Sequence, residues 1–205
     1  MPVETRDRIL EAALVSFGGR GYDAVSLDSI ARDSGIRKQT VLYYFGSKDA
    51  LMEAVIDRTV ADLTAALLES VEAPPPATGG AGGLPDAWAG VEAVVRAVFR
   101  FAVRRPEMLG LLREVTRLGP PWMDRVRAGF EPLVERARAF LEAGMESGAI
   151  RRCDARLLLV STYSTVMGVA TEVEVLRAVG VEPTLRDTVL RRRELLRFLR
   201  SALVG

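Results

Sequence analysis

Residues 26–45 read SLDSIARDSGIRKQTVLYYF and contain two short helical patterns separated by a glycine. Ser26 can cap the first pattern, and the second has room for about two turns before Gly46. Two helices that cross steeply through a short turn need a small residue at the crossing, a turn glycine, and apolar residues beneath the second helix. The residues of those kinds are Ala31, Gly35, and then Ile30, Ile36 and Val41. The spacing predicts a helix-turn-helix.

Helical spacing of apolar residues extends on both sides of this motif. Before it, an amphipathic helix is expected from near Thr5 to the glycines at 18–21, where it would cover the open side of the helix pair. After it, Ser47 and Asp49 are start signals for a long helix that keeps its apolar spacing to about Val71. Residues 74–85 are rich in proline and glycine, which predicts a mobile loop or tether.

Five further helical patterns follow, each bounded by a proline, a glycine or an aspartate, at about 87–104, 106–118, 121–147, 154–178 and 183–203. No segment shows the two-residue alternation of a strand. The sequence therefore predicts an all-α fold of about nine helices. A three-helix N-terminal headpiece with the helix-turn-helix would occupy residues 1–46, and a larger C-terminal helical bundle residues 47–205.

The composition is that of an ordinary globular protein. The chain has 205 residues, 49% of them hydrophobic and 27% charged, with 28 basic and 27 acidic side chains. The longest nearly apolar run, residues 157–170, is interrupted by serines and threonines and is shorter than the roughly 18 to 20 residues that cross a bilayer. The N-terminus carries no pattern of a secretory signal. We therefore expect a cytoplasmic protein with no membrane partner.

Two absences exclude whole classes of enzyme. Histidine is missing, and Cys153 is the only cysteine. The chain thus lacks the usual general base, the imidazole of a catalytic triad, and the ligands of a common zinc site. We expect no catalytic residues, no metal site and no cofactor. Cys153 follows two arginines that could activate a redox-sensing thiol, although a lone cysteine at a helix start is usually incidental.

The second helix of a helix-turn-helix lies in the DNA major groove and leads with its N-terminal residues. Here those residues are Arg37, Lys38, Gln39 and Thr40. Arginine or lysine can bond guanine O6 and N7, and glutamine can pair with adenine through two hydrogen bonds. Threonine can bond either a base edge or a phosphate. The order of these side chains predicts a base-reading surface.

Other polar side chains of the motif can contact the phosphate backbone. Tyr43 and Tyr44 would bring hydroxyls to the groove wall, and Lys48 adds a cation beside them. Ser26 can present its hydroxyl and the amides of a helix end to another phosphate. Lys38 and Lys48 are the only lysines in a chain that otherwise uses arginine, and both fall on this surface. The predicted partner is double-stranded DNA.

Four segments of this region form a distinctive combination: GYDAVS at 21–26, IA at 30–31, SGI at 34–36 and TVLYYFGSKDAL at 40–51. Together they resemble the headpiece of the TetR family of transcriptional regulators. The resemblance covers about residues 5–56. Leu42 stands where the family usually has a tyrosine, and Arg37 and Gln39 stand where smaller residues are common. These departures bear on which DNA sequence is preferred.

The resemblance implies a ligand-binding and dimerising domain in residues 47–205 and a homodimer that pairs through its last two long helices. The sequence supports such a dimer in part, because the helix from Asp154 carries small residues that allow a partner helix to approach closely. The last helix repeats leucines beside a row of arginines. The expected function is that of a repressor, released from a palindromic operator when a small-molecule effector binds.

Aromatic and methionine side chains of the middle helices would line an effector pocket, with Glu114 as a polar anchor. The same residue types at helical spacing also form ordinary cores, and this alternative stays open. A lining of this kind favours an apolar or aromatic, or a cationic, small molecule. The candidates are Phe101, Met108, Glu114, Trp122, Met123, Phe130, Tyr163 and Met167.

Two other functions remain as alternatives. The first is a helical small-molecule-binding protein or enzyme with a vestigial headpiece, using carboxylates such as Glu114 or Asp124 as acid and base. The second is an architectural DNA-binding protein that responds to no ligand. A C-terminal bundle without a pocket would favour the second.

Overall fold

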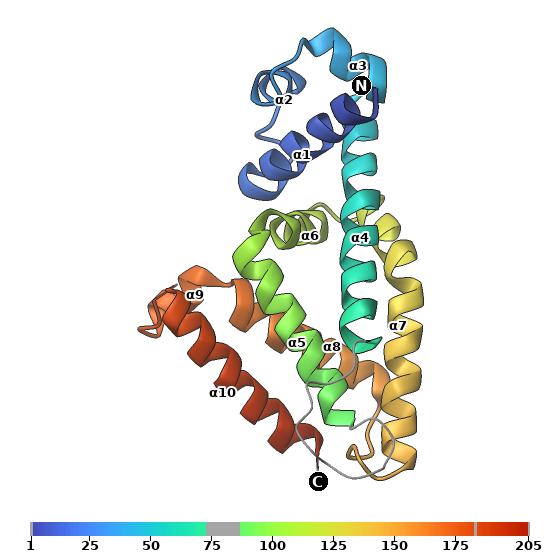
Figure 1. Ribbon diagram of the computed structural model, residues 1–205, viewed down its shortest axis with the longest axis vertical. Helices are drawn as coiled ribbons and strands as arrows, with labels where there is room; N and C mark the ends of the chain where they lie inside the picture. Colours follow the sequence, from blue (N-terminus) through green and yellow to red (C-terminus); the bar gives the residue numbers. More distant parts are fainter. Residues whose placement is uncertain (1, 73–86, 183, 205) are drawn as a thin grey trace. The chain divides into compact units, whose positions relative to one another are not determined.

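The computed structural model describes residues 2–72, 87–182 and 184–204, and every regular element in these ranges is a helix. The all-α fold class is thus confirmed (Figure 1). The loop expected at 74–85 lies outside the described residues. In order, the helices are α1 (Pro2–Arg20), α2 (Leu27–Asp33), α3 (Lys38–Phe45), α4 (Lys48–Glu72), α5 (Ala87–Arg104), α6 (Pro106–Leu118), α7 (Trp122–Glu146), α8 (Ala155–Thr171), α9 (Val173–Ala178) and α10 (Leu185–Leu203).

The described ranges hold ten helices, where the sequence predicted about nine. The single helix expected over 154–178 was wrong, because the chain leaves helical geometry at Glu172, where φ is −83° and ψ is 72°. That residue ends α8 and also precedes the first turn of α9. Neither proline nor glycine stands there. The break therefore had no local signal in the sequence.

Several helix starts follow the capping signals in the sequence. The Asp154 carboxylate accepts hydrogen bonds from the N–H groups of Arg156 and Leu157 at the start of α8. The Ser47 hydroxyl accepts one from the Ala50 N–H, 3.0 Å away, at the start of α4. These oxygens satisfy amide groups that have no partner inside the helix. The predictions that Ser47 and Asp154 begin helices are confirmed.

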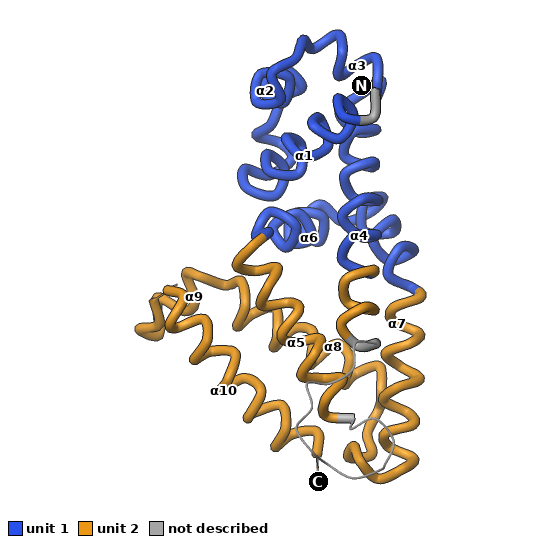
Figure 2. Tube along the Cα trace, in the orientation of Figure 1, with its two compact units in different colours: residues 1–64, 105–131 blue, residues 65–104, 132–205 orange. Residues whose placement is uncertain are grey.

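The chain packs as two compact units, shown in different colours in Figure 2. Unit 1 comprises Met1–Thr64 and Arg105–Glu131, and unit 2 comprises Ala65–Arg104 and Pro132–Gly205. Unit 1 therefore holds α1, α2, α3 and α6 with parts of α4 and α7. The functional boundary expected between residues 46 and 47 stays a prediction.

The core of unit 1 includes the apolar stripe of α1. The members of that stripe, Ile9, Leu10, Ala13, Leu14 and Phe17, are all buried. Against it lies α6, whose buried residues include Met108, Leu111 and Val115.

Helices α1 and α6 approach so closely that only glycine fits at their contact. A Cβ atom on Gly110 would lie 2.4 Å from the Gly18 carbonyl oxygen, and one on Gly18 would lie 2.2 Å from the Glu107 carbonyl oxygen. Real side chains do not tolerate such distances to backbone atoms. The two backbones therefore touch directly.

Unit 2 has its own core, built by α5, α8 and α10. Its main cluster consists of Val95, Phe99, Val166, Ala170, Leu195, Leu199 and Leu203, and a smaller cluster contains Leu141, Met145 and Ile150. Among the described residues, no helix is long and apolar enough to cross a membrane.

Candidate nucleic-acid interface

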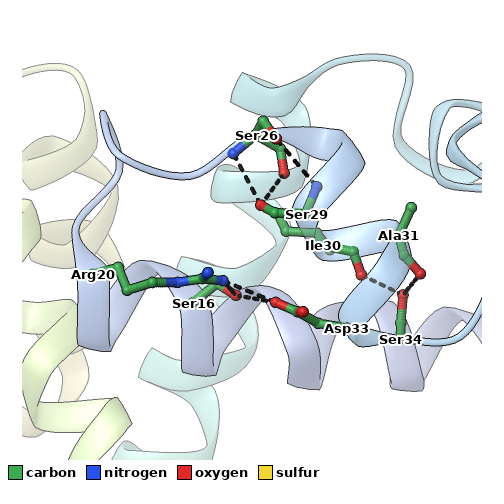
Figure 3. Close-up of polar contacts among 8 residues, drawn as sticks. All are labelled: Ser16, Arg20, Ser26, Ser29, Ile30, Ala31, Asp33 and Ser34. Carbon is green, nitrogen blue, oxygen red and sulfur yellow. Dashed lines mark hydrogen bonds and ion pairs between the residues drawn. The ribbon is translucent and has the colours of Figure 1, made fainter.

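Helix α2 begins with a reciprocal pair of serine hydrogen bonds (Figure 3). The Ser29 N–H donates to the Ser26 hydroxyl oxygen at 3.1 Å, and the Ser26 N–H donates to the Ser29 hydroxyl oxygen at 3.2 Å. This capping box satisfies two amide groups at once. The prediction that Ser26 caps this helix is confirmed. Its side chain remains exposed beside the helix end.

Helices α1 and α2 are joined by polar contacts at the far end of α2. The Arg20 guanidinium donates to the Ser16 hydroxyl at 2.6 Å and to the Asp33 carboxylate at 2.8 Å (Figure 3). The Ser34 hydroxyl donates to the Ile30 carbonyl at 2.6 Å. The bond between Arg20 and Asp33 holds the last turn of α2 against α1, and the Ser34 bond caps α2 itself.

The turn into α3 has the geometry that the motif predicted. Gly35 has a φ of +68°, a left-handed conformation that side chains disfavour. The Ile36 N–H donates to the Ala31 carbonyl at 2.9 Å, which closes the turn. Arg8 of α1 donates to the Ser34 carbonyl at 2.5 Å. Val41, on the inner face of α3, is fully buried, so the packing of this side chain sets the position of the helix.

The N-terminal residues of α3 face solvent as predicted for a base-reading surface. Arg37, Lys38 and Gln39 are exposed, and Thr40 is half-buried. The Lys38 ammonium pairs with the Asp28 carboxylate of α2 at 2.8 Å. Arg37 forms no ion pair within the described ranges. The long polar side chains at positions 37 and 39 are therefore the most available for contact with a partner.

The expected phosphate contacts lie along α3 and at the start of α4. Tyr43 is 85% exposed and stands edge-on to the ring of Tyr44, with 5.5 Å between the ring centroids. The Lys48 ammonium lies 4.0 Å from the centre of the Tyr22 ring, a cation–π contact that positions it without a carboxylate. Unit 1 thus contains all eight predicted DNA-binding residues. Their contacts with DNA stay a prediction.

Tyr22 joins several elements of unit 1, a role that was not predicted from the sequence. Its hydroxyl donates to Asp49 of α4, and its backbone N–H donates to the Glu114 carboxylate of α6 at 2.7 Å. Its ring packs against Phe17 and Trp122, with centroids 5.5 and 5.7 Å away. Burial and the Asp49 carboxylate raise the pKa of the Tyr22 hydroxyl, so it stays a proton donor. An aromatic residue between a glycine and an aspartate was its only sequence signal.

Helix α6 is bound to the N-terminal segment by charged groups as well. Arg117 donates to Glu114 at 2.8 Å and to Asp23 at 3.0 Å. Arg105, which precedes α6, pairs with Glu11 of α1 at 2.9 Å. Hydrogen bonds from Arg117 and from the Tyr22 N–H hold the pKa of Glu114 below its usual range. Glu114 is only 10% exposed, so these bonds are little screened by water.

The substitution Glu114→Gln is expected to lower the free energy of unfolding by about 1–3 kcal/mol near neutral pH, because it weakens charge-assisted hydrogen bonds. A carboxylate with a depressed native pKa stabilises the fold above its unfolded pKa, and this stabilisation is lost as pH falls through the native pKa. Urea unfolding curves of the two proteins should therefore converge as the pH is lowered from about 7 towards 3. An unchanged difference at acid pH would contradict this role.

The eight predicted effector-binding residues divide between the two units. Unit 1 contains Met108, Glu114, Trp122, Met123 and Phe130, and unit 2 contains Phe101, Tyr163 and Met167. Met108 is buried, whereas Tyr163 is 56% exposed. Glu114 and Trp122 both contact Tyr22. Their role in ligand binding stays a prediction.

Other chemistry expected from the sequence can be located only in part. Cys153 is exposed and carries a free thiol. No group of three or more Cys, Asp or Glu side chains in the described ranges is arranged to hold a metal ion.

A family model matches the N-terminal segment of this chain, and a curated relative matches most of its length. Residues 9–55, which include all eight predicted DNA-binding positions, match the family model of bacterial regulatory proteins, tetR family. The HTH-type transcriptional regulator RutR of Escherichia coli K12 is 27% identical over 185 residues, covering 88% of this chain and 80% of RutR. The negative transcriptional regulator IcaR of the icaADBC biofilm operon of Staphylococcus aureus (strain Newman) is 38% identical over 48 residues, covering 23% of this chain and 26% of IcaR.

Solved structures share the fold. A transcriptional regulator from Saccharomonospora viridis, crystallised in complex with choline, superposes with a TM-score of 0.76 and 20% sequence identity. The match covers 99% of each chain. The fold of this chain is therefore shared with that solved structure.

Proposed function

Because the chain belongs to the tetR family of bacterial regulatory proteins, we propose that it represses transcription as a homodimer on a palindromic operator and is released by a small-molecule effector. That it is a DNA-binding transcriptional regulator follows from the family, and the relatives that it matches are regulators rather than enzymes. The observation that carries the proposal is α3, which is exposed at Arg37 and Gln39 and seated on the buried Val41.

In this proposal, Arg37, Lys38 and Gln39 contact base edges in the major groove, and the remaining predicted residues contact phosphates. Arginine and glutamine both make paired hydrogen bonds to purines, which gives sequence discrimination. Contacts to phosphates fix the register of the protein on the duplex but carry no sequence information. The phosphate-binding set is Ser26, Thr40, Tyr43, Tyr44 and Lys48.

Repression is inferred from a relative. IcaR is named a negative transcriptional regulator, and its match with this chain is 48 residues long. A bound repressor would block transcription from the operator that it occupies. A bacterial protein that acts on chromosomal DNA works in the cytoplasm, which is the location that we propose.

Exposed apolar side chains on α8 and α10 support the homodimer. Leu157, Val160 and Tyr163 of α8 are 68%, 62% and 56% exposed, and Leu190 and Phe198 of α10 are 46% and 58% exposed. Large apolar groups that gather on one surface usually mark an interaction site. A two-fold pair of these helices would cover them in both copies. Such a dimer suits two α3 helices about 34–36 Å apart, one turn of DNA.

The substitution Phe198→Glu is expected to raise the dissociation constant of the dimer at least about thirtyfold, because a central aromatic contributes about 2 kcal/mol or more to an interface. Sedimentation velocity would detect the monomer. The matched control is Val134→Glu on α7, which introduces the same charge at a side chain that is 48% exposed. A dimer that tolerates Phe198→Glu as well as it tolerates Val134→Glu would exclude this part of α10 from the interface.

The proposed effector would act by shifting a pre-existing equilibrium between two states of the dimer. It can do so only if it binds one state more tightly than the other. The backbone could carry a change in α5 to α6, because Arg105 is the only residue between these helices. Arg105 also pairs with Glu11 of α1. The bound choline of the Saccharomonospora viridis regulator supports a small organic effector. We propose a small apolar or aromatic molecule, and a screen that retained only sugars or nucleotides would contradict this.

Selection of bound fragments from random and upstream DNA by the purified protein tests the proposed function. The expected product is a palindromic site, and log affinity should fall with log salt at a slope of roughly −0.9 per phosphate neutralised. If no fragment is enriched over bulk DNA at any salt concentration, the headpiece does not read sequence. An architectural DNA-binding protein or an enzyme with a vestigial headpiece would then replace the proposal.

A further inference from the structure

Unit 2 contains a pocket of about 200 Å³ between α5 and α10. Phe99 is 2% exposed and forms an apolar floor, whereas Val103, Leu185 and Val189 are 45%, 72% and 57% exposed at the rim. The lining residues are Phe99, Arg100, Val103, Arg104, Leu185, Thr188, Val189 and Arg192.

Three of the lining side chains are arginines, and no lining side chain is acidic. Within the described ranges, Arg100, Arg104 and Arg192 form no ion pair or hydrogen bond. Neighbouring arginines differ, since Arg96 pairs with Glu92 one turn earlier on α5. Like charges at i and i+4, the spacing of Arg100 and Arg104, repel one another on a helix. The pocket therefore gathers positive charge that the protein leaves uncompensated.

We propose that this pocket binds an amphipathic anion, meaning a carboxylate or a phosphate monoester joined to a short apolar group. The planar guanidinium groups of Arg100, Arg104 and Arg192 match the paired oxygens of either anion. Phe99, Val103 and Val189 would cover the apolar part. A volume below the roughly 300 Å³ of ordinary ligand pockets limits that part to a short chain or a small ring.

The pocket lies on a different face of α10 from the proposed dimer contact. Val189 and Arg192 lie three residues apart on one side of α10. At 100° per residue, Phe198 is turned about 180° from Val189, and Leu190 about 160° from Arg192. The side of α10 that lines the pocket is therefore not the one that carries Leu190 and Phe198. The inference is independent of the proposed function, because it needs neither an operator nor a dimer.

Isothermal titration of the full chain with hexanoate and hexyl phosphate tests the ligand class, with hexanol and hexylammonium as neutral and cationic probes of equal chain length. We expect saturable binding of at least one anion, weakened by added salt, and affinity for hexanol and hexylammonium lower by about tenfold or more. The two anions separate a carboxylate site from a phosphate site. Equal affinity for hexanol and both anions would overturn the proposal.

Variants locate the site. Arg100→Gln and Arg192→Gln should each weaken anion binding about tenfold. Arg186→Gln is the matched control, because it removes the same charge from an exposed position of α10 outside the pocket. Unchanged thermal unfolding would show that each variant is folded. An equal loss in all three variants would overturn the proposal, since it would indicate attraction by the general charge of the helix.

Discussion

Replacing Gly110 with alanine is expected to lower the free energy of unfolding by about 3 kcal/mol or more. The new Cβ atom would lie 2.4 Å from the carbonyl oxygen of Gly18, and backbone at a helix crossing cannot turn aside as a flexible side chain can. The helices must separate, which strains the bonds that join α6 to Tyr22 and Glu11. This loss outweighs the roughly 1 kcal/mol that alanine gains over glycine within a helix.

Gly19 provides the matched control one residue away from the contact in α1. A Cβ atom there meets nothing within 4 Å, so Gly19→Ala should raise stability by about 0.5–1 kcal/mol. Urea unfolding of the three proteins measures both effects with the same chemical change. If Gly110→Ala is as stable as Gly19→Ala, the backbones of α1 and α6 are not in direct contact.

The double substitution Arg37→Ala and Gln39→Ala is expected to weaken binding to the selected operator by about 2–6 kcal/mol, at least about thirtyfold. Each side chain that reads a base by paired hydrogen bonds contributes about 1–3 kcal/mol of discrimination. Both residues are exposed at the start of α3, so the variant should fold normally. Its affinity for random DNA should change far less, and competition titrations against both DNAs measure the difference.

Lys48→Ala is the comparison for this pair, because a phosphate contact is independent of sequence. It should weaken operator and random DNA alike and reduce the salt slope by about one. The ammonium lies on the Tyr22 ring and forms no ion pair with the residues that the structure describes, so its loss leaves none of their carboxylates unpaired. Equal loss on operator and random DNA for the Arg37 and Gln39 variant would exclude the base-reading role of these two residues.

The parts of the fold that the sequence predicted are those set by local chemistry. Ser26, Ser47 and Asp154 cap helices because each side chain bonds amide groups two or three residues away. Ile30 and Val41 are buried as their spacing indicated. The break between α8 and α9 at Glu172 was missed, since neither proline nor glycine stands there to mark it.

The parts that were not predicted depend on contacts between residues far apart in the chain. Tyr22 and Glu114 are 92 positions apart, and nothing in the local pattern of either one indicates the bond between them. Glu114 was named as a ligand anchor because it is a carboxylate in an apolar helix. In the structure it accepts bonds from Tyr22 and Arg117. Periodicity shows that a side chain faces inward, but not which helix it meets.

The ion pair between Lys38 and Asp28 bears on how a repressor finds its operator. Any DNA group that bonds the Lys38 ammonium must compete with the Asp28 carboxylate, which already lies 2.8 Å away. This competition lowers the attraction to any duplex, whereas the hydrogen bonds of Arg37 and Gln39 to a matching base pair are unaffected. Genomes offer about 10⁶–10⁹ competing sites, so the ratio of specific to non-specific affinity governs occupancy. In the proposed complex, pairing one of the two lysines with Asp28 would leave a larger share of the affinity to Arg37 and Gln39, which read sequence.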